Sequence, residues 1–528
     1  MEQPASEEKR EKPFSFYASV VCLALLVFIV SWDATSLSVA IPAVASQFQA
    51  TTIESFWTSI AFMLGVAVSQ PIYVSLSDVL GRKLPLYASM VLFAVGCILF
   101  ATAESISTVV AGRALQGLGG GGLDVLESII LTDMTTLSER PLWMGLMAIP
   151  VALGTILGPI IGSLFAEHVS WRWIGWVNLP FVGVAFLLAV FFLHLRPLGM
   201  DFRGKLLRID WGGMALFTVG ATSFVLPLSW ADALFPWSSW RTIVPLIIGI
   251  LVLAVFAWYE TKPVAPMFPY RVFSTTTASM AIFGAFINGL QLYTLLFYIP
   301  LFFQAVFLDT PLESAVHLLP FCGLFVAFSL IVPMSVPVFG QYRWQIWSGW
   351  VLQTLALGLL CLMGRTPNSG AVAYVLQALL GAGIGALFMT NYVPLQAAVV
   401  TRSVDDTGVA SGMLVVFRLF GGLIGLAIGS GVFNSVFASR ISSLGLLSGP
   451  FSPLRDPTQA VGFIPELLGI DMDNPVLTEV VEAYRSAFEA LWITLTGISG
   501  LGCVSSIFIK HYAVDNKEMG RQRLEESS

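Results

Sequence analysis

Charged side chains occur inside several long apolar stretches of this 528-residue chain. Asp33 lies in one stretch, and Arg113, Asp124 and Glu127 lie together in another. Ionisable groups are costly to place in hydrocarbon, so each of these residues is a candidate functional group. A carboxylate can take up and release a proton, and a guanidinium stays charged and changes the proton affinity of an acid beside it. These residues therefore indicate proton transfer or the binding of a charged group.

The composition shows what kind of element must position them. Hydrophobic residues make up 56% of the chain and charged residues only 11%, as in polytopic membrane proteins and unlike soluble enzymes. Nucleic acid is not an expected partner. The five cysteines are scattered through apolar runs and indicate neither disulfides nor a thiolate metal site. The sequence contains no H-E-x-x-H, G-x-x-x-x-G-K-[ST] or Cys–His cluster, so we expect no cofactor, and a membrane enzyme or receptor is the less favoured alternative.

Fourteen apolar runs are long enough to cross a membrane, which takes about 20 helical residues. They lie at 15–42, 54–76, 84–103, 107–131, 142–166, 174–195, 210–230, 242–259, 276–304, 313–337, 345–363, 371–394, 408–436 and 486–509. An even number places both termini on one side of the membrane. Of the 26 Lys and Arg residues, 18 fall on that side, 6 on the opposite side and 2 inside helices, so the termini are predicted to be cytoplasmic.

The expected fold is an all-α polytopic membrane protein with six helices, two additional helices and six more. Glycines at four-residue spacing occur in the fifth and thirteenth runs, which are equivalent positions if the second six repeat the first. The predicted parts are a cytoplasmic tail (1–14), an N-terminal six-helix bundle (15–195), a linker with two extra helices (196–275), a C-terminal six-helix bundle (276–509) with an external loop (437–485), and a second cytoplasmic tail (510–528).

The loop between the second and third runs has the spacing D-x-x-G-R-K, formed by Asp78, Gly81, Arg82 and Lys83. By itself this basic hairpin can be a topology signal only. The pattern resembles the loop between helices 2 and 3 of major facilitator superfamily transporters, where the acid and the basic residues form a cytoplasmic latch. This resemblance implies that the four residues stabilise the state that is closed to the cytoplasm.

The fifth run contains G-x-x-x-G-P-x-x-G, formed by Gly154, Gly158, Pro159 and Gly162. Small residues permit close helix packing and proline supplies a kink, so an ordinary tight helix crossing is one interpretation. The stretch also resembles the one regarded as the mark of antiporters in the superfamily. The run at 171–180 is similar to that of fungal toxin and metabolite efflux pumps, although its composition also fits an aromatic interface belt. Together they imply the fourteen-helix drug:proton antiporter branch.

The same resemblance gives roles to two buried charges. Asp33 follows Trp32 in a run similar to a helix-1 motif of this branch, and the family places its proton-relay arginine where Arg113 stands. At 1.5 Å per residue, Asp33 is about 27 Å along its helix and Arg113 about 9 Å below the outer end of its own. The two are therefore expected at comparable depth and to couple protons to transport. A static ion pair is the alternative.

Further polar residues inside the runs are candidates for lining a substrate cavity. Asp124 and Glu127 can bind a cationic substrate, but pairing with Arg82 and Lys83 is favoured. His317 is either a packing residue or a proton carrier. The full set of cavity candidates is Gln116, Asp124, Glu127, Asn288, Gln291, His317, Asn391 and Arg418.

The sequence therefore predicts a proton-coupled efflux transporter for hydrophobic toxins, drugs or secondary metabolites. Two halves would rock about a midplane site, driven by a proton gradient. We expect a monomer in the lipid bilayer of the plasma membrane, or else of a vacuole or vesicle. A facilitator or importer is the alternative, disfavoured by the antiporter-like run and by the absence of a sugar-porter P-E-S-P-R run.

Overall fold

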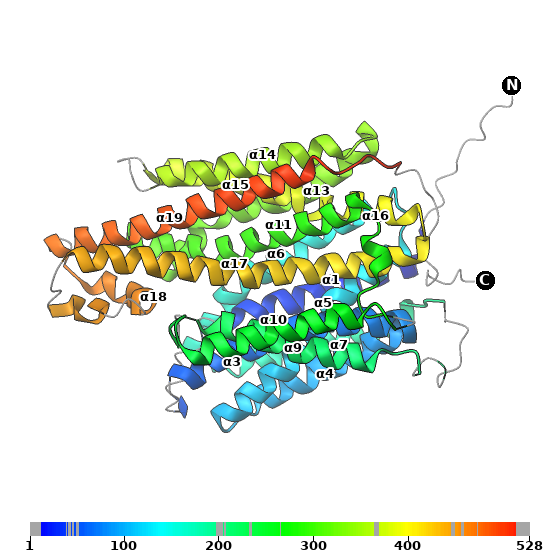
Figure 1. Ribbon diagram of the computed structural model, residues 1–528. Helices are drawn as coiled ribbons and strands as arrows, with labels where there is room; N and C mark the ends of the chain where they lie inside the picture. Colours follow the sequence, from blue (N-terminus) through cyan, green and yellow to red (C-terminus); the bar gives the residue numbers. More distant parts are fainter. Residues whose placement is uncertain are drawn as a thin grey trace.

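The chain folds into a bundle of long helices that run side by side (Figure 1). The computed structural model describes residues 12–37, 40, 44, 47–48, 52–196, 204, 207–231, 235–263, 266–363, 369–444, 449–455, 459–471 and 474–513. Within these residues, thirteen helices are long and apolar enough to cross a membrane. A further long helix, α5 (Ile106–Met134), carries four charged residues and is buried among the other helices. With α5 included, the structure has the fourteen long helical segments that the sequence predicts.

The N-terminal half is arranged around α5. Its central glycines allow close contact, because a Cβ atom on Gly112, Gly117 or Gly119 would collide with the backbone of α3 or α4. The helix bounds in this half are α1 Phe14–Ser36, α3 Thr52–Leu80, α4 Lys83–Ala101, α5 Ile106–Met134, α6 Arg140–His168 and α7 Trp173–Phe192.

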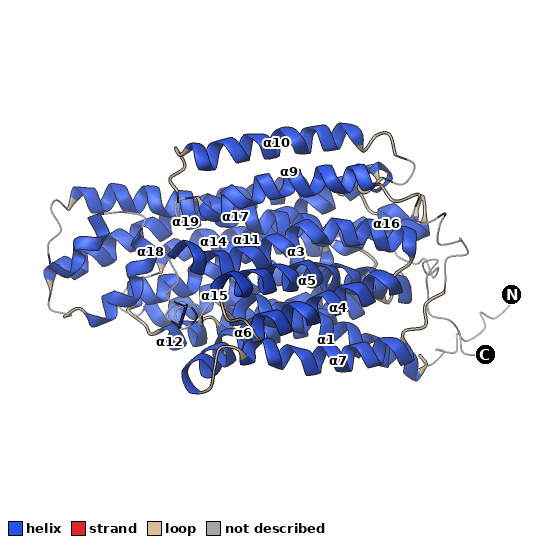
Figure 2. Cartoon of the chain, turned by 90° about the horizontal axis from the view of Figure 1, so that it is seen from below, coloured by secondary structure: helices blue, strands red, loops and turns tan. Residues whose placement is uncertain are grey.

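The two additional helices form a hairpin at the side of the bundle (Figure 2). Helix α9 spans Trp211–Trp230 and α10 spans Trp240–Tyr259. Within the hairpin, α9 contacts α3 of the N-terminal half and α17 of the C-terminal half. The ring of Phe217 on α9 packs on Phe420 of α17 at 6.0 Å between centroids. The hairpin therefore touches both halves.

The C-terminal half repeats the packing of the first. Gly154, Gly158 and Gly162 of α6 lie against the backbone and side chains of α1, and Gly421 and Gly425 of α17 lie in the same way against α11. The bounds here are α11 Thr276–Phe302, η2 Phe303–Phe307, α12 Pro311–His317, α13 Leu319–Phe339, α14 Arg343–Leu359, α15 Ser369–Thr390, α16 Tyr392–Val400, α17 Thr407–Ser443 and α19 Pro475–Ser506.

The external loop predicted at 437–485 is largely helical. Helix α17 continues to Ser443 and α19 begins at Pro475. Between them lie η5 (Gly449–Arg455), α18 (Ala460–Phe463) and η7 (Ile464–Gly469), here called the outer cap. The Tyr484 hydroxyl of α19 donates to the Ala460 carbonyl at 2.6 Å. The prediction ended the helices too early because the first turns of α19 are amphipathic and bury only one face.

The end of the first helix also differs from the prediction. The first run was predicted to be helical over 15–42, but α1 ends at Ser36, and most of the run beyond Leu37 lies outside the described residues. The start of α1 and the end of α7 lie at one end of the bundle, where the rings of Phe14 and Phe192 are 5.4 Å apart. The end of α19 lies at this same end in Figure 1, which we call the cytoplasmic end after the predicted topology.

Candidate functional site

A buried ion pair joins α1 to α5 inside the N-terminal half. Arg113 Nη1 donates to Asp33 Oδ2 at 2.6 Å, and its Nη2 donates to the Asp33 backbone carbonyl at 3.3 Å. Asp33 is fully buried and Arg113 is 2% exposed. The ring of Phe62 lies against the guanidinium, 4.3 Å from centroid to Cζ, and a cation gains from such a contact. The two buried charges thus neutralise each other.

Both carboxylate oxygens of Asp33 have donors. Asn178 Nδ2 of α7 donates to Oδ1 at 2.8 Å, and Gln116 Nε2 of α5 reaches the same atom at 3.4 Å. The Arg113 Nε donates to the Thr58 carbonyl of α3 at 3.3 Å. Asn178 sits in the run that the sequence suggested was an aromatic interface belt, so its role was not predicted. The sequence signal that could have indicated this role is the occurrence of an asparagine among the tryptophans of that run.

Close packing fixes the helix that carries Asp33. A Cβ atom on Gly154 would meet the Phe28 carbonyl of α1 at 2.7 Å, and one on Gly158 would meet the Trp32 carbonyl at 3.0 Å. Gly162 lies against Ser36 in the same way. Pro159 lies within α6 between these glycines, where it removes one helical N–H. The G-x-x-x-G-P-x-x-G stretch is therefore the contact surface for α1.

A second group of charges lies between the two halves. Asp124 Oδ2 accepts from Gln70 Nε2 at 2.7 Å. The guanidinium of Arg418 on α17 is close enough to interact electrostatically with Asp124 and Glu127 of α5, and it stacks on Tyr392. Glu127 Oε1 and Arg418 Nε are buried and lack partners among the described residues. We call these five residues the interhalf cluster: Gln70, Asp124, Glu127, Tyr392 and Arg418.

The remaining candidates of the C-terminal half differ in their hydrogen-bond partners. Asn288 Nδ2 donates to the Ile384 carbonyl at 3.3 Å, and Gln291 Nε2 donates to the Leu495 carbonyl at 3.1 Å, so these two bridge helices. Asn391 lies at the break between α15 and α16, and both polar atoms of its side chain are buried with no partner within the described ranges. His317, the last residue of α12, contacts Asp309 in the turn between η2 and α12 at 2.6 Å.

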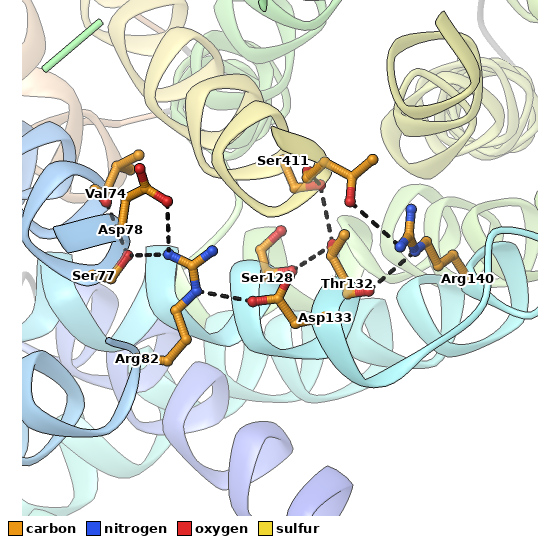
Figure 3. A network of polar contacts seen from close by, with 10 residues as sticks. Val74, Ser77, Asp78, Arg82, Ser128, Thr132, Asp133, Arg140 and Ser411 are labelled. Atoms are coloured by element: carbon orange, nitrogen blue, oxygen red, sulfur yellow. Dashed lines mark hydrogen bonds and ion pairs between the residues drawn. The ribbon is translucent and has the colours of Figure 1, made fainter. Parts of the chain in front are cut away.

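At the cytoplasmic end, the loop between α3 and α4 holds a buried arginine (Figure 3). Gly81 has φ +96°, a conformation that favours glycine, and turns the chain so that Arg82 faces inward. Arg82 Nε donates to Asp133 Oδ2 at 2.9 Å, whereas Asp78 lies 3.9 Å from Nη1 and is 23% exposed. Lys83 begins α4 at the half-buried edge of this loop.

Contacts between the halves close this end of the protein (Figure 3). Thr132 Oγ1 of α5 lies 3.0 Å from Ser411 Oγ of α17, and Ser128 Oγ lies 3.3 Å from the Tyr392 hydroxyl of α16. Arg140 Nη2 reaches Thr407 Oγ1 at 3.5 Å. A Cβ atom on Gly408 would lie 2.9 Å from Asp133 Oδ1, so α17 begins directly against the Arg82–Asp133 pair. We call this set of contacts the cytoplasmic gate, and it is closed in this structure.

The favoured pairing of Asp124 and Glu127 with Arg82 and Lys83 was wrong. Arg82 pairs with Asp133, and Asp124 pairs with Gln70. The reason is the length of α5, which continues to Met134 and so places Asp133 level with the loop. The predicted helix ended at 131, and this left Asp133 outside it.

The comparisons with known proteins agree with this architecture. The family model "Major Facilitator Superfamily" matches residues 23–426. The chain belongs to this superfamily. A solved structure described as the human organic anion transporter MFSD10 (TETRAN) is similar in fold, with a TM-score of 0.55 and 14% identity over 94% of this chain and 100% of that one.

Several fungal members of the superfamily are similar over nearly the whole chain. The MFS-type transporter sphD of Aspergillus fumigatus is 46% identical over 98% of this chain and 90% of its own length. The acurin A biosynthesis cluster MFS-type transporter of Aspergillus aculeatus is 34% identical over 94% of this chain and 86% of its own. The efflux pump FUS6 of Gibberella fujikuroi is 31% identical over 95% of this chain and 90% of its own. The chain is therefore a multi-pass integral membrane protein of a transporter superfamily.

Proposed function

We propose that this protein exports hydrophobic small molecules, such as secondary metabolites or toxins, in exchange for protons. Export is supported by the relatives, one of which is named an efflux pump and another a biosynthesis-cluster transporter. The observation that carries proton exchange is the Asp33–Arg113 pair, an acid and a fixed cation buried together in a transporter half. We further propose that the protein works as a monomer in the plasma membrane without catalysing a chemical reaction.

The charge balance of the pair suggests how one proton can act. An ionised Asp33 is held by the guanidinium and by Asn178. Protonation from the outside removes the attraction to Arg113 and leaves a cation that must find other partners, here the Thr58 carbonyl and the Gln116 side chain. Rearrangement of α1 relative to α5 is the expected consequence. Return of the proton to the cytoplasm restores the pair.

Substrate is proposed to bind between the halves at the interhalf cluster. Gln70 Oε1, Glu127 Oε1 and Arg418 Nε of this cluster are buried and have no partner among the described residues. The two oxygens can accept a hydrogen bond from a polar group on an otherwise apolar molecule, and Arg418 Nε can donate one. The cytoplasmic gate lies next to this cluster, since Ser128 of the gate bonds Tyr392 of the cluster. Opening the gate would expose the cluster to the cytoplasm, and closing it would leave release to the outside as the remaining step.

The proposal is tested with purified protein in lipid vesicles and a panel of apolar fungal metabolites. We expect substrate to be concentrated against its gradient when a pH gradient is imposed, and proton movement to accompany it. Equilibration without accumulation would instead identify a facilitator. Matched vesicles that contain an Asp33→Asn variant serve as the control for coupling.

A further inference from the structure

Two carboxylates lie buried at the cytoplasmic end of the α9–α10 hairpin. Asp210 directly precedes α9 and Glu260 directly follows α10, and the two residues are only 6% and 2% exposed. A Cβ atom on Gly213 would collide with Asp210 Oδ2 and with Glu260 Oε1 at once. The two carboxyl groups therefore meet beside the same glycine, in a place where any larger residue would separate them.

The hydrogen bonds leave one position between the carboxyl groups unfilled. Asp210 Oδ1 accepts from the Gly213 N–H at 2.8 Å, and Glu260 accepts from the Met267 and Phe268 N–H groups at 3.3 and 3.0 Å. Asp210 Oδ2 is buried and has no donor among the described residues. Two ionised carboxylates that meet beside one glycine repel each other. A proton on one of them removes this repulsion and supplies the hydrogen-bond donor that the other lacks.

We propose that Asp210 and Glu260 form a proton-binding site in which the two carboxyl groups share one proton. Burial and the neighbouring Asp210 raise the pKa of Glu260 to about 7. The site therefore exchanges its proton close to neutral pH. It lies outside the membrane-spanning segments and is distinct from the Asp33–Arg113 pair.

Among the residues that the structure describes, the charged groups around the site leave the pair without a neutralising cation. On the neighbouring elements, Arg271 of η1 (Tyr270–Phe273) pairs with Asp406 at 3.0 Å, Arg82 pairs with Asp133, and Arg418 stacks on Phe388 at 3.8 Å. Arg208 and Lys262 are exposed to solvent. The Tyr259 hydroxyl of α10 lies near Asp210 without completing a hydrogen bond to Oδ2, and it carries no positive charge. A proton is thus the charge that can balance the pair.

The shared proton would fasten the hairpin to the C-terminal half. Glu260 holds the backbone of Met267 and Phe268, and the Phe268 ring packs on Phe217 and Phe256 of the hairpin at 5.5 Å each. The same ring contacts Phe417 of α17 at 6.2 Å. Loss of the proton makes the two carboxylates repel across Gly213 and loosens this junction.

The sign of the pH effect follows from the raised pKa. The folded protein binds this proton more tightly than the unfolded chain, so its stabilising effect is complete below about pH 4.5 and is lost as the pH rises through about 7. In Glu260→Gln, the amide donates to Asp210 without titrating. The melting temperature of the wild type relative to this variant should fall by roughly 2 °C across that window. Glu479→Gln on α19, an exposed acid, is the matched control and should follow the wild type.

Infrared spectroscopy of the purified proteins gives a second readout that does not depend on stability. The wild type should show a protonated-carboxyl C=O band that disappears on titration near pH 7. Glu260→Gln and Asp210→Asn should each lack it, because either amide supplies the hydrogen-bond donor and leaves the remaining acid ionised. A wild-type band and an unchanged pH profile of the melting temperature in both variants would overturn the proposal.

Discussion

The Asp33–Arg113 pair and the interhalf cluster differ in which helices supply their residues. Among the described residues, the partners of the Asp33–Arg113 pair lie on α1, α3, α5 and α7 of the N-terminal half, and both acid oxygens have donors. The interhalf cluster takes Glu127 from one half and Arg418 from the other, and an atom of each has no partner in the described part of the chain. The first group therefore moves with one half, whereas the second exists only while the two halves are together.

This difference separates two tasks that a coupled transporter must perform. A group inside one half stays within that half through the whole cycle and can take up and release its proton there, which suits a proton site. A group assembled by both halves changes its geometry whenever they rock, which suits the capture and release of a ligand. The following variants can strengthen or break this division, beginning with the largest expected effect.

Asp33→Asn is expected to abolish gradient-driven efflux. The change leaves the Arg113 cation buried without its counterion, at a cost of about 3–5 kcal/mol of folding free energy. The double variant Asp33→Asn/Arg113→Gln removes both charges and should recover the melting temperature but not the coupling. Vesicle uptake under an imposed pH gradient distinguishes the two effects. Accumulation by the single variant would place coupling elsewhere, with Asp124 and Glu127 the next residues to test.

Asp133→Asn should open the cytoplasmic gate. It removes the buried partner of Arg82 and so shifts the equilibrium by up to about 3–5 kcal/mol towards the state open to the cytoplasm. A cysteine placed at Ser411 reports the change through its labelling by a thiol reagent from the cytoplasmic side. Asp78→Asn is the matched control, because Asp78 is partly exposed and 3.9 Å away, and its loss should cost about 0–1 kcal/mol. Equal labelling in the two variants would contradict the assignment of Asp133.

Gly158→Ala should damage the site that belongs to the N-terminal half. The added methyl group would collide with the Thr35 hydroxyl and press on the Trp32 carbonyl beside Asp33, and such overpacking costs about 1–3 kcal/mol. Gly183→Ala on α7 meets no atom within 4 Å and should leave the protein unchanged. The melting temperatures and transport rates of the two variants make the comparison. If Gly183→Ala proved as harmful as Gly158→Ala, close packing on α1 would not be the reason.

Glu127→Gln should change substrate affinity and leave proton coupling intact. The substitution preserves shape and removes one charge from a cluster that is open to a ligand, so we expect KM to change about 10-fold, equivalent to about 1.4 kcal/mol. Efflux should still depend on the pH gradient. Loss of that dependence, as in Asp33→Asn, would show that the two groups share one task.

The number and order of the helices could be predicted from the sequence because each membrane span requires its own continuous apolar run. The Asp33–Arg113 pair could also be anticipated, since two opposite charges at equal depth in hydrocarbon have few other partners. Family membership, helix count and glycine contacts all follow from signals of this kind, which are written into the local sequence.

Other features depend on tertiary contacts that local sequence does not carry. Asp133 is at the polar end of α5 and is enclosed only because α17 of the other half begins against it. The sequence suggested that Asn178 is part of an interface belt, because its hydrogen bond to Asp33 forms only when α7 packs against α1. The amphipathic start of α19 was assigned to a loop because half of its surface is polar and the outer cap covers the rest.

Because α17 and α19 are long, a movement of the C-terminal half produces a large displacement of the outer cap. Helix α17 has 37 residues and α19 has 32, so at 1.5 Å per residue they are about 55 and 48 Å long, well beyond the roughly 30 Å of hydrocarbon. Both run unbroken to the cap, which lies beyond the other helices in Figure 1. A small tilt of this half about the midplane therefore displaces the cap through a larger arc than it displaces Arg418. Spin labels or fluorophores on the cap would therefore report each conformational change of transport as a large change in distance, which can be measured in water.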